Sequence, residues 1–306
     1  MLLAQAVEEF LIAGEADGLS RATTRWYSSL MKGLITSMGK RDLSGITASD
    51  MRRYIVALDV QGYSDDTISA HKRALHRFWK WCTVEYNIPN PMANIRYPKQ
   101  IRQHDPKAVT LEDVLQLFEA ARAENETRHP LSKFRDPAMI AFLFDTGCRG
   151  EGIVSLKMSN LDMDRRMAVV QEKGRKTRRV VFTRLTAELL KRWLDVRSDV
   201  ETVFYNLHTG QKMQVNGLYQ MLKRLAESAG IAGRWNPHAF RHAFAREYLR
   251  AGGDLVTLSR LMGHSDVSTT ANFYAIYTQD ELDERHEQYS PMRRVKNQNV
   301  LENEDI

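Results

Sequence analysis

The chain has 306 residues, of which 43% are hydrophobic and 27% are charged, the composition of a soluble globular protein long enough for two domains. No apolar run approaches the roughly 20 residues that span a bilayer, and two glutamates follow the opening MLLAQAV too closely for a secretory signal. We therefore expect a cytoplasmic protein without a membrane partner, and the net charge of +6 weakly favours a polyanionic one.

The two cysteines, Cys82 and Cys148, lie in different halves of the chain, and neither belongs to a paired motif. This arrangement indicates neither a disulfide framework nor a zinc site. We expect both thiols to be small buried side chains, and the sequence predicts no metal site.

The first hundred residues predict helices and no strands. The segments with helical periodicity cover residues 2–13, 20–38, 47–61 and 64–86. Ser20, Thr47 and Ser64 can cap the last three of these helices. We expect a small helical bundle, which forms a first domain over residues 1–95.

Two of these helices concentrate cations away from their apolar stripes. The cations of the second and fourth helices include Arg21, Arg25, Lys72, Arg73, Arg77 and Lys80. Such a face is either a solvated helix surface or one side of a pair of helices that straddle a DNA duplex through phosphate contacts. The second interpretation makes these six side chains candidate DNA-binding residues.

The composition changes after Asn87, where IPNPMANIRYPKQIRQHDPK contains four prolines and no apolar periodicity. Proline-rich, basic and unpatterned segments are typical of interdomain linkers. We expect a linker over residues 96–108, a second domain over residues 109–290, and a flexible C-terminal tail over residues 291–306.

The second domain contains the predicted sheet. Thr110 can cap its first helix, and another helix is expected over residues 136–144. Residues 160–182 read as strand, basic turn and strand, and a further short hairpin is expected over 203–215, before a helix that ends near Gly230. The fold class is therefore mainly α with a small antiparallel β-hairpin region: an N-terminal helical domain followed by a mostly α, mixed α/β domain.

Residues 236–277 hold the highest density of chemically useful side chains. Asn236 can cap a helix in which Pro237 takes the first position. His238 and Arg241 stand three residues apart, so they project together from one side of this helix.

Two shorter helices are expected to follow. Asp254 can cap the first, Gly263 ends it, and His264 comes directly afterwards. Ser268 can cap the second, which carries Tyr274. Taken one at a time, these residues indicate a helical hairpin with histidines at the edge of the core and a packed tyrosine.

The combination of motifs, however, resembles the tyrosine recombinase (phage integrase) family. H-x-x-R, then L-M-G-H-S, then a tyrosine follow the order of its C-terminal signature; T-G-C-R resembles its T-G-L-R motif, and K-G-R-K-T-R its K-G-x-K-x-R hairpin. The first domain resembles the core-binding domain of the simple two-domain type. The resemblance implies the catalytic set Arg149, Lys173, His238, Arg241, His264 and Tyr274.

In that family the tyrosine attacks the scissile phosphate and forms a 3′-phosphotyrosyl link, which a 5′-hydroxyl later reverses without metal or ATP, so that no cofactor is implied. Tyr274 is the implied nucleophile, ahead of Tyr277. Arg149 and Arg241 would clamp the non-bridging oxygens.

The remaining groups have implied roles in proton transfer and phosphate binding. Lys173, ahead of Lys176, would act as general acid toward the departing 5′-oxygen. His238 would assist deprotonation of the tyrosine, and His264 would hydrogen-bond the phosphate. Arg175, together with Lys176, is a candidate DNA-binding residue of the basic turn.

The sequence departs from the family at one position. The family has an acidic residue three positions after its first catalytic arginine, where this chain has Gly152. Our hypothesis at this point is that the neighbouring Glu151 substitutes for it through a small backbone shift.

The resemblance implies a site-specific DNA recombinase that integrates, excises or resolves a DNA element in the cytoplasm, on the nucleoid. It also implies a tetramer on two double-stranded DNA sites, with exchange of the C-terminal segment that begins as the charged helix 278–288; a frayed tail is the alternative. A type IB topoisomerase, a non-catalytic DNA-binding relative and a helical structural protein are the competing functions.

Overall fold

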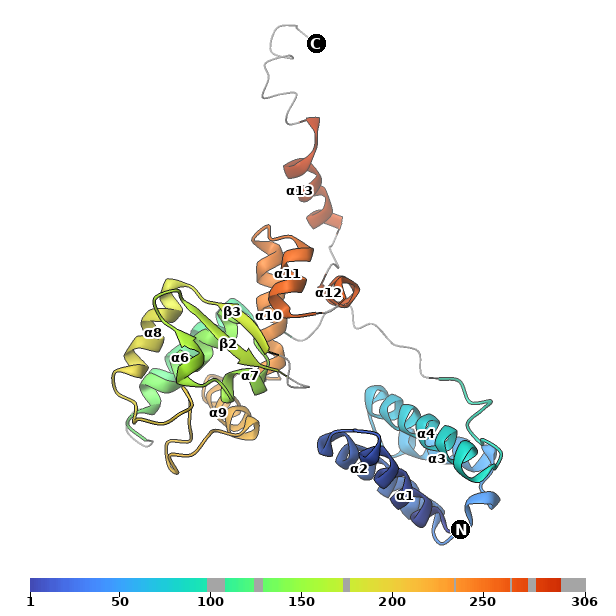
Figure 1. Ribbon diagram of the computed structural model, residues 1–306. Helices are drawn as coiled ribbons and strands as arrows, with labels where there is room; N and C mark the ends of the chain where they lie inside the picture. Colours follow the sequence, from blue (N-terminus) through green and yellow to red (C-terminus); the bar gives the residue numbers. More distant parts are fainter. Residues whose placement is uncertain are drawn as a thin grey trace, which may run out of the picture. The chain divides into compact units, whose positions relative to one another are not determined.

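The computed structural model describes residues 1–97, 108–123, 129–172, 177–233, 235–264, 266–274 and 279–292, without the side chains of residues 269, 272–274, 279–282 and 285. The chain divides into two compact units, Met1–Ile101 and Arg102–Ile306. The junction falls inside the segment predicted as a linker. The fold class predicted from the sequence is confirmed: the structure is mostly helical with one small antiparallel sheet (Figure 1).

The first unit is a four-helix bundle with a short 3-10 turn. Its elements are α1 (Leu3–Ala16), α2 (Arg21–Met38), η1 (Leu43–Gly45), α3 (Ala48–Val60) and α4 (Asp65–Tyr86). Its core is rich in aromatic side chains, and the ring of Phe10 makes edge contacts with Tyr27 and Phe78. The predicted caps are confirmed, because the hydroxyls of Ser20, Thr47 and Ser64 each accept a hydrogen bond from a backbone N–H three residues later.

The second unit carries the remaining elements. In chain order they are α5 (Leu111–Ala123), α6 (Ser132–Thr146), α7 (Gly150–Val154), η3 (Met158–Asn160), β1 (Leu161–Asp162), β2 (Met167–Gln171), β3 (Thr177–Val181), α8 (Arg184–Leu194), α9 (Val215–Ser228), α10 (Pro237–Arg250), α11 (Leu255–Met262), α12 (Val267–Tyr274) and α13 (Gln279–Tyr289). The sequence did not predict α8 or the short strand β1. The residues expected to form a second hairpin hold a single antiparallel bridge, between Tyr205 and Lys212.

Helix α6 is the centre of the second unit, and it packs against α5, α8 and α10. Every residue from Arg135 to Leu143 is buried. The helix begins at Ser132, four residues before the predicted start, and continues through Pro137. Burial on all sides stabilises this helix enough to outweigh the hydrogen bond that the proline removes.

The sheet has the order β1-β2-β3 with both pairs antiparallel. Val170 pairs with Arg178, so the side chains of these two residues share a face. That face is turned inward, because Ala168 and Val170 are fully buried and Val180 nearly so. The next positions on the same face, Glu172 and Arg178, are therefore directed into the unit rather than into solvent.

The C-terminal helices follow the predicted capping with one exception. Asn236 caps α10, and Asp254 caps α11, each by accepting from a backbone N–H three residues later. Ser268 was expected to cap α12, but this prediction is wrong. Asp266 accepts from the backbone N–H and the hydroxyl of Ser268, and the helix begins at Val267.

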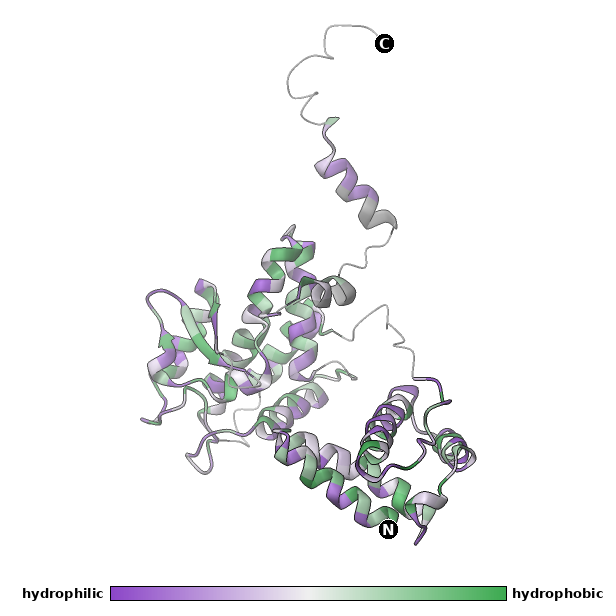
Figure 2. Cartoon of the chain, turned by 45° about the vertical axis from the view of Figure 1, so that its right-hand side comes forward, coloured by the Kyte–Doolittle hydropathy of each residue, from purple (hydrophilic) through white to green (hydrophobic). Residues whose placement is uncertain are grey.

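Helix α13 confirms the charged helix expected near the C-terminus, one residue later than predicted at each end. The coloured part of α13 is hydrophilic in Figure 2, and Tyr289 is 59% exposed. In the part of the chain that the structure describes, no helix is both long and apolar enough to cross a bilayer. Cys82 and Cys148 are buried free thiols, as predicted.

Candidate active site

Two predicted arginines converge on a carboxylate that the sequence analysis did not select. Arg149 is the N-cap residue of α7, and Glu172 directly follows β2. The Arg149 guanidinium donates to Glu172 Oε2, while Arg241 of α10 holds Nη1 at 3.9 Å from Glu172 Oε1. The Arg149 side chain is 32% exposed and that of Arg241 only 6%. Arg149 is thus the arginine nearer to solvent.

Backbone carbonyls fix the position of Arg241. Its Nη1 donates to the carbonyl of Gly147 at 2.8 Å, and its Nη2 to the carbonyl of Met262 at 2.6 Å. Gly147 has a φ of 54°, and a Cβ there would lie 2.4 Å from the ring of Phe244. Only glycine can therefore turn the chain here and present this carbonyl to the guanidinium.

His264 is held in one tautomer by its two neighbours. Its Nε2 lies 3.0 Å from Arg241 Nη2, which can only donate, so Nε2 accepts and the proton is assigned to Nδ1. Nδ1 then donates to the Thr270 hydroxyl at 2.7 Å. Burial, followed by the charges of Arg241 and Arg149, lowers the pKa of His264 to about 4. The neutral imidazole in this arrangement supports Arg241.

A second histidine stands one turn before Arg241 on α10. Desolvation of the His238 ring, although the residue as a whole is exposed, lowers its pKa, and the charges of Arg241 and Arg149 lower it further. The neutral form can accept a proton at physiological pH. The neighbouring His242 has a pKa lowered to about 4, mainly by burial and then by His238 and Arg241.

Helix α12 is connected to the site through Thr270, which is completely buried. Tyr274 is the last residue of this helix, one turn after Thr270. Its side chain lies outside the described residues, and so do Lys173, Arg175 and Lys176 of the basic turn. The structure therefore brings Arg149, Arg241 and His264 together beside α12, with His238 close to the two arginines.

The second unit, which contains these residues, matches a known protein family. A model of the phage integrase family matches residues 107–280. The chain belongs to this family. It is 31% identical over 291 residues to the tyrosine recombinase XerC of Alcanivorax borkumensis, covering 92% of this chain and 91% of that protein. It is also 30% identical over 289 residues to XerD of Listeria monocytogenes, covering 90% and 94%.

Solved structures of recombinases share the fold of this tyrosine recombinase. The Tn1549 transposon integrase in complex with a circular intermediate DNA matches with a TM-score of 0.76 at 19% identity, over 95% of this chain and all of that one. A λ integrase dimer bound to a core site matches with a TM-score of 0.72 at 17% identity, covering 88% and 97%. The predictions of the family and of a site-specific DNA recombinase are confirmed.

The carboxylate that contacts the site arginines of this recombinase is not the one that we expected. Glu151 is exposed, and within the described part of the chain its carboxylate has no hydrogen-bond or ion-pair partner. The hypothesis that Glu151 replaces the acid at Gly152 is therefore wrong. The buried carboxylate is Glu172, and Arg178, which also bonds it, is the second residue that the sequence analysis missed. The alternation of side chains along the hairpin places both residues on its inward face, and this pattern could have identified them.

The six cations predicted on α2 and α4 lie on the surface of the first unit. Arg77 of α4 extends across the ring of Tyr27 on α2, with its guanidinium carbon 5.6 Å from the ring centre. Arg73 and Lys80 are exposed. Among the described residues, no ion pair joins any of the six to a carboxylate.

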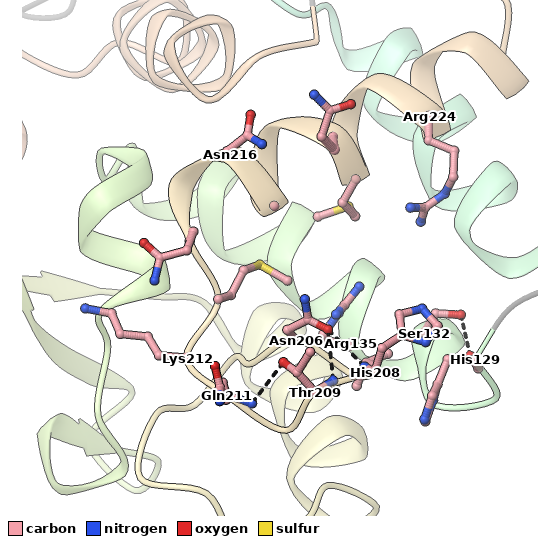
Figure 3. Close-up of a pocket in the computed structure, with 16 residues that line it drawn as sticks. His129, Ser132, Arg135, Asn206, His208, Thr209, Gln211, Lys212, Asn216 and Arg224 are labelled. Carbon is pink, nitrogen blue, oxygen red and sulfur yellow. Dashed lines mark hydrogen bonds between the residues drawn. The ribbon is translucent and has the colours of Figure 1, made fainter. Parts of the chain in front are cut away.

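A hollow of about 630 Å³, lined by both polar and apolar residues, opens beside α9 (Figure 3). Among the described residues, Arg135, Lys212 and Arg224 line it together with several amide side chains. The buried Asp136 pairs with Arg135 and Arg224. Helix α9 also packs against α7, the helix that Arg149 caps. In the described ranges, no three His, Cys, Asp or Glu side chains are placed to hold a metal ion.

Proposed function

We propose that this recombinase cleaves and rejoins duplex DNA through a covalent link between Tyr274 and a 3′-phosphate. The observation that supports it best is the convergence of Arg149, Arg241 and His264 next to the helix that ends at Tyr274. Two guanidinium groups beside a nucleophile match the needs of phosphoryl transfer, in which negative charge grows on the non-bridging oxygens.

The chemistry needs two proton transfers as well. The Tyr274 phenol oxygen attacks phosphorus while its proton passes to His238. The lowered pKa of His238 keeps an imidazole nitrogen unprotonated and available as a base. The bond to the 5′-oxygen breaks, and Lys173 supplies the proton that this oxygen takes up. Rejoining reverses these steps when a 5′-hydroxyl attacks the phosphotyrosine.

The neutral His264 has a supporting role in this proposal. Its Nε2 accepts from Arg241, and its Nδ1 donates to Thr270, so no N–H remains for the phosphate in this arrangement. A hydrogen bond from His264 to the phosphate would require DNA to draw Arg241 away and a proton to move to Nε2.

The test is covalent trapping on a nicked suicide substrate, built from DNA that flanks the gene. The wild-type chain should form a phosphotyrosyl adduct that survives denaturation, and Tyr274→Phe should form none. Tyr277→Phe is the matched control and should still form the adduct. Adducts with Tyr274→Phe would overturn the choice of nucleophile, and a wild-type chain without adducts would overturn the proposal.

We propose that the cations of α2 and α4 bind the DNA phosphates and that, in the second unit, the basic turn with Arg175 and Lys176 does the same. The hollow beside α9 supports a further contact with the duplex, because cations and amide side chains are among the described residues that line it. Arg73→Ala should reduce the salt slope of binding by about one phosphate contact, roughly 0.9 in log K against log salt. The control variant Arg52→Ala, on α3, should leave the salt slope unchanged. Equal slopes in the two variants would contradict the assignment of Arg73 as a phosphate contact.

The proposed assembly is a tetramer on two DNA sites in which α13 docks on a neighbouring copy. The hydrophilic sequence of α13 and the exposure of its Tyr289 support this docking. Deletion of residues 279–306 should abolish cooperative assembly on paired sites while preserving binding to one site, measured by gel shift. Equal loss of both would contradict docking in trans. Acting on chromosomal DNA would place the protein on the nucleoid, in the cytoplasm.

A further inference from the structure

We propose that Glu172 is the positioning residue of this active site and that it replaces, from the end of a strand, the acid that the family carries three residues after its first arginine. The proposal rests on the proposed function, because it assigns Glu172 the task of aiming Arg149 and Arg241 at the scissile phosphate. Glu172 itself does not touch the DNA.

The contacts of Glu172 carry the argument. Its side chain is 7% exposed. One carboxylate oxygen accepts from Arg149, and the other accepts from Arg178 Nη2 at 3.0 Å and Nε at 3.3 Å. Arg241 lies 3.9 Å from that second oxygen. A buried carboxylate among three guanidinium groups fixes their planes relative to one another, which a solvated acid could not do.

Gly152 explains why the acid is on the strand. A Cβ at Gly152 would lie 3.3 Å from Cβ of Val170, which is tighter than ordinary contacts, and 3.7 Å from the carbonyl of Gln171. A longer acidic side chain there would press on β2, the strand that ends at Gln171. The close packing of α7 against β2 thus crowds a side chain at position 152, and it brings Glu172 to Arg149 and Arg241.

The charge balance favours a single carboxylate at this place. Glu172 is a carboxylate in contact with the guanidinium groups of Arg149 and Arg178 and close to that of Arg241. A second acid at position 152 would add a negative charge beside these groups and weaken the attraction for the transition state.

Arg178 completes the arrangement. Besides Glu172, its guanidinium donates to the carbonyl of Leu261, near the end of α11. A Cβ at Gly263 would lie 2.6 Å from Arg178 Cδ, so the glycine before His264 is needed for this approach. Arg178 therefore ties Glu172 to the segment that carries His264, and it is a positioning residue as well.

The experiment compares Glu172→Gln with Glu151→Gln, on a nicked suicide substrate at saturating DNA. Glu172→Gln keeps the shape of the side chain but replaces one acceptor oxygen by an NH2 group, which is a donor and cannot accept from the guanidinium groups. We expect adduct formation to slow by about 10²-fold, the usual effect of losing one well-placed charge-stabilising group, with the Kd for DNA changed by less than about threefold. Glu151→Gln should match the wild type.

A second substrate separates Glu172 from the adjacent Lys173. A bridging sulfur in place of the 5′-oxygen leaves without a proton, so it should restore cleavage by Lys173→Ala, which lacks the general acid. The defect of Glu172→Gln should persist on this substrate, because Glu172 acts through the arginines. Glu172→Asp, which keeps the charge on a shorter stem, should give an intermediate rate with the same insensitivity to sulfur, and it serves if the glutamine variant fails to fold.

Three results would overturn the proposal: a wild-type rate in Glu172→Gln, a defect that sulfur removes, or a loss in Glu151→Gln as large as that in Glu172→Gln. Failure of the proposed function looks different, because it removes adducts from the wild-type chain itself.

Discussion

Replacing Arg178 by methionine should destabilise the second unit far more than the same change at Arg179. The two residues are adjacent on β3, but Arg178 faces inward with a side chain 10% exposed, while Arg179 is exposed. Methionine keeps an unbranched stem of similar length and removes every hydrogen-bond donor. The pair of variants therefore measures the inward guanidinium alone.

The magnitude follows from the bonds that are lost. Arg178 makes two charge-assisted hydrogen bonds to Glu172 and one to the carbonyl of Leu261. Breaking a buried ion pair costs about 3–5 kcal/mol when its partner is left alone. Glu172 keeps Arg149, so we expect the lower end, about 3 kcal/mol. Arg179→Met should change the free energy of unfolding by less than about 0.5 kcal/mol.

Hydrogen exchange read by mass spectrometry is the suitable assay, because it follows peptides of each unit separately and does not assume that both unfold together. A loss of about 3 kcal/mol corresponds to exchange about 10²-fold faster in peptides of α10 and α11. Peptides of the first unit serve as an internal control. A loss below about 1 kcal/mol in Arg178→Met, or equal losses in the two variants, would refute the reasoning.

Three further predictions concern the histidines and a helix cap. The pKa of His264 and that of His242 are both about 4 in the folded chain and near 6.5 in the unfolded chain, so the chain takes up protons when it unfolds at a pH between these values. The stability from these two groups should be complete above pH 6.5 and fall as the pH drops toward 4. A urea midpoint that stays the same between pH 7 and pH 5 would contradict this. Thr270→Val leaves Nδ1 of His264 without its acceptor, so cleavage should slow by about tenfold at unchanged DNA affinity, and nitrogen NMR should show the tautomer shifting; an unchanged spectrum would disprove the assigned bond. Asn236→Ala removes the cap of α10 and should cost about 1 kcal/mol, seen as faster exchange in the first turn of α10, whereas equal exchange in the variant and the wild type would mean that the cap contributes nothing.

Local signals predicted much of this fold correctly. The hydroxyls of Ser20 and Ser64 cap helices of the first unit, and Asn236 caps the helix that carries two of the site residues. Caps are readable because donor and acceptor are three residues apart. The start of α6 was less readable, since Pro137 favours a boundary and only the surrounding core shows that the helix continues.

The carboxylate of the site was not predicted because it depends on the register of a hairpin. Ala168, Val170 and Glu172 follow a period of two, and Arg178 lies opposite Val170 on the same face. This pattern was present in the sequence, but the segment was interpreted through the K-G-x-K-x-R hairpin of the family, which selected Lys173 and Lys176 rather than Glu172 and Arg178. The packing of Gly152 against Val170, which brings α7 so close to the strand, could come only from the structure.

The turn at Gly147 has a consequence for attempts to retarget this enzyme by laboratory evolution. Its positive φ and the ring of Phe244 leave no room for a side chain, and its carbonyl orients Arg241. Gly152 is packed more loosely, against Val170. Libraries that randomise Gly147 would lose most of their members to misfolding, whereas α2, α4 and the hollow beside α9 offer surfaces where variation leaves the catalytic scaffold intact.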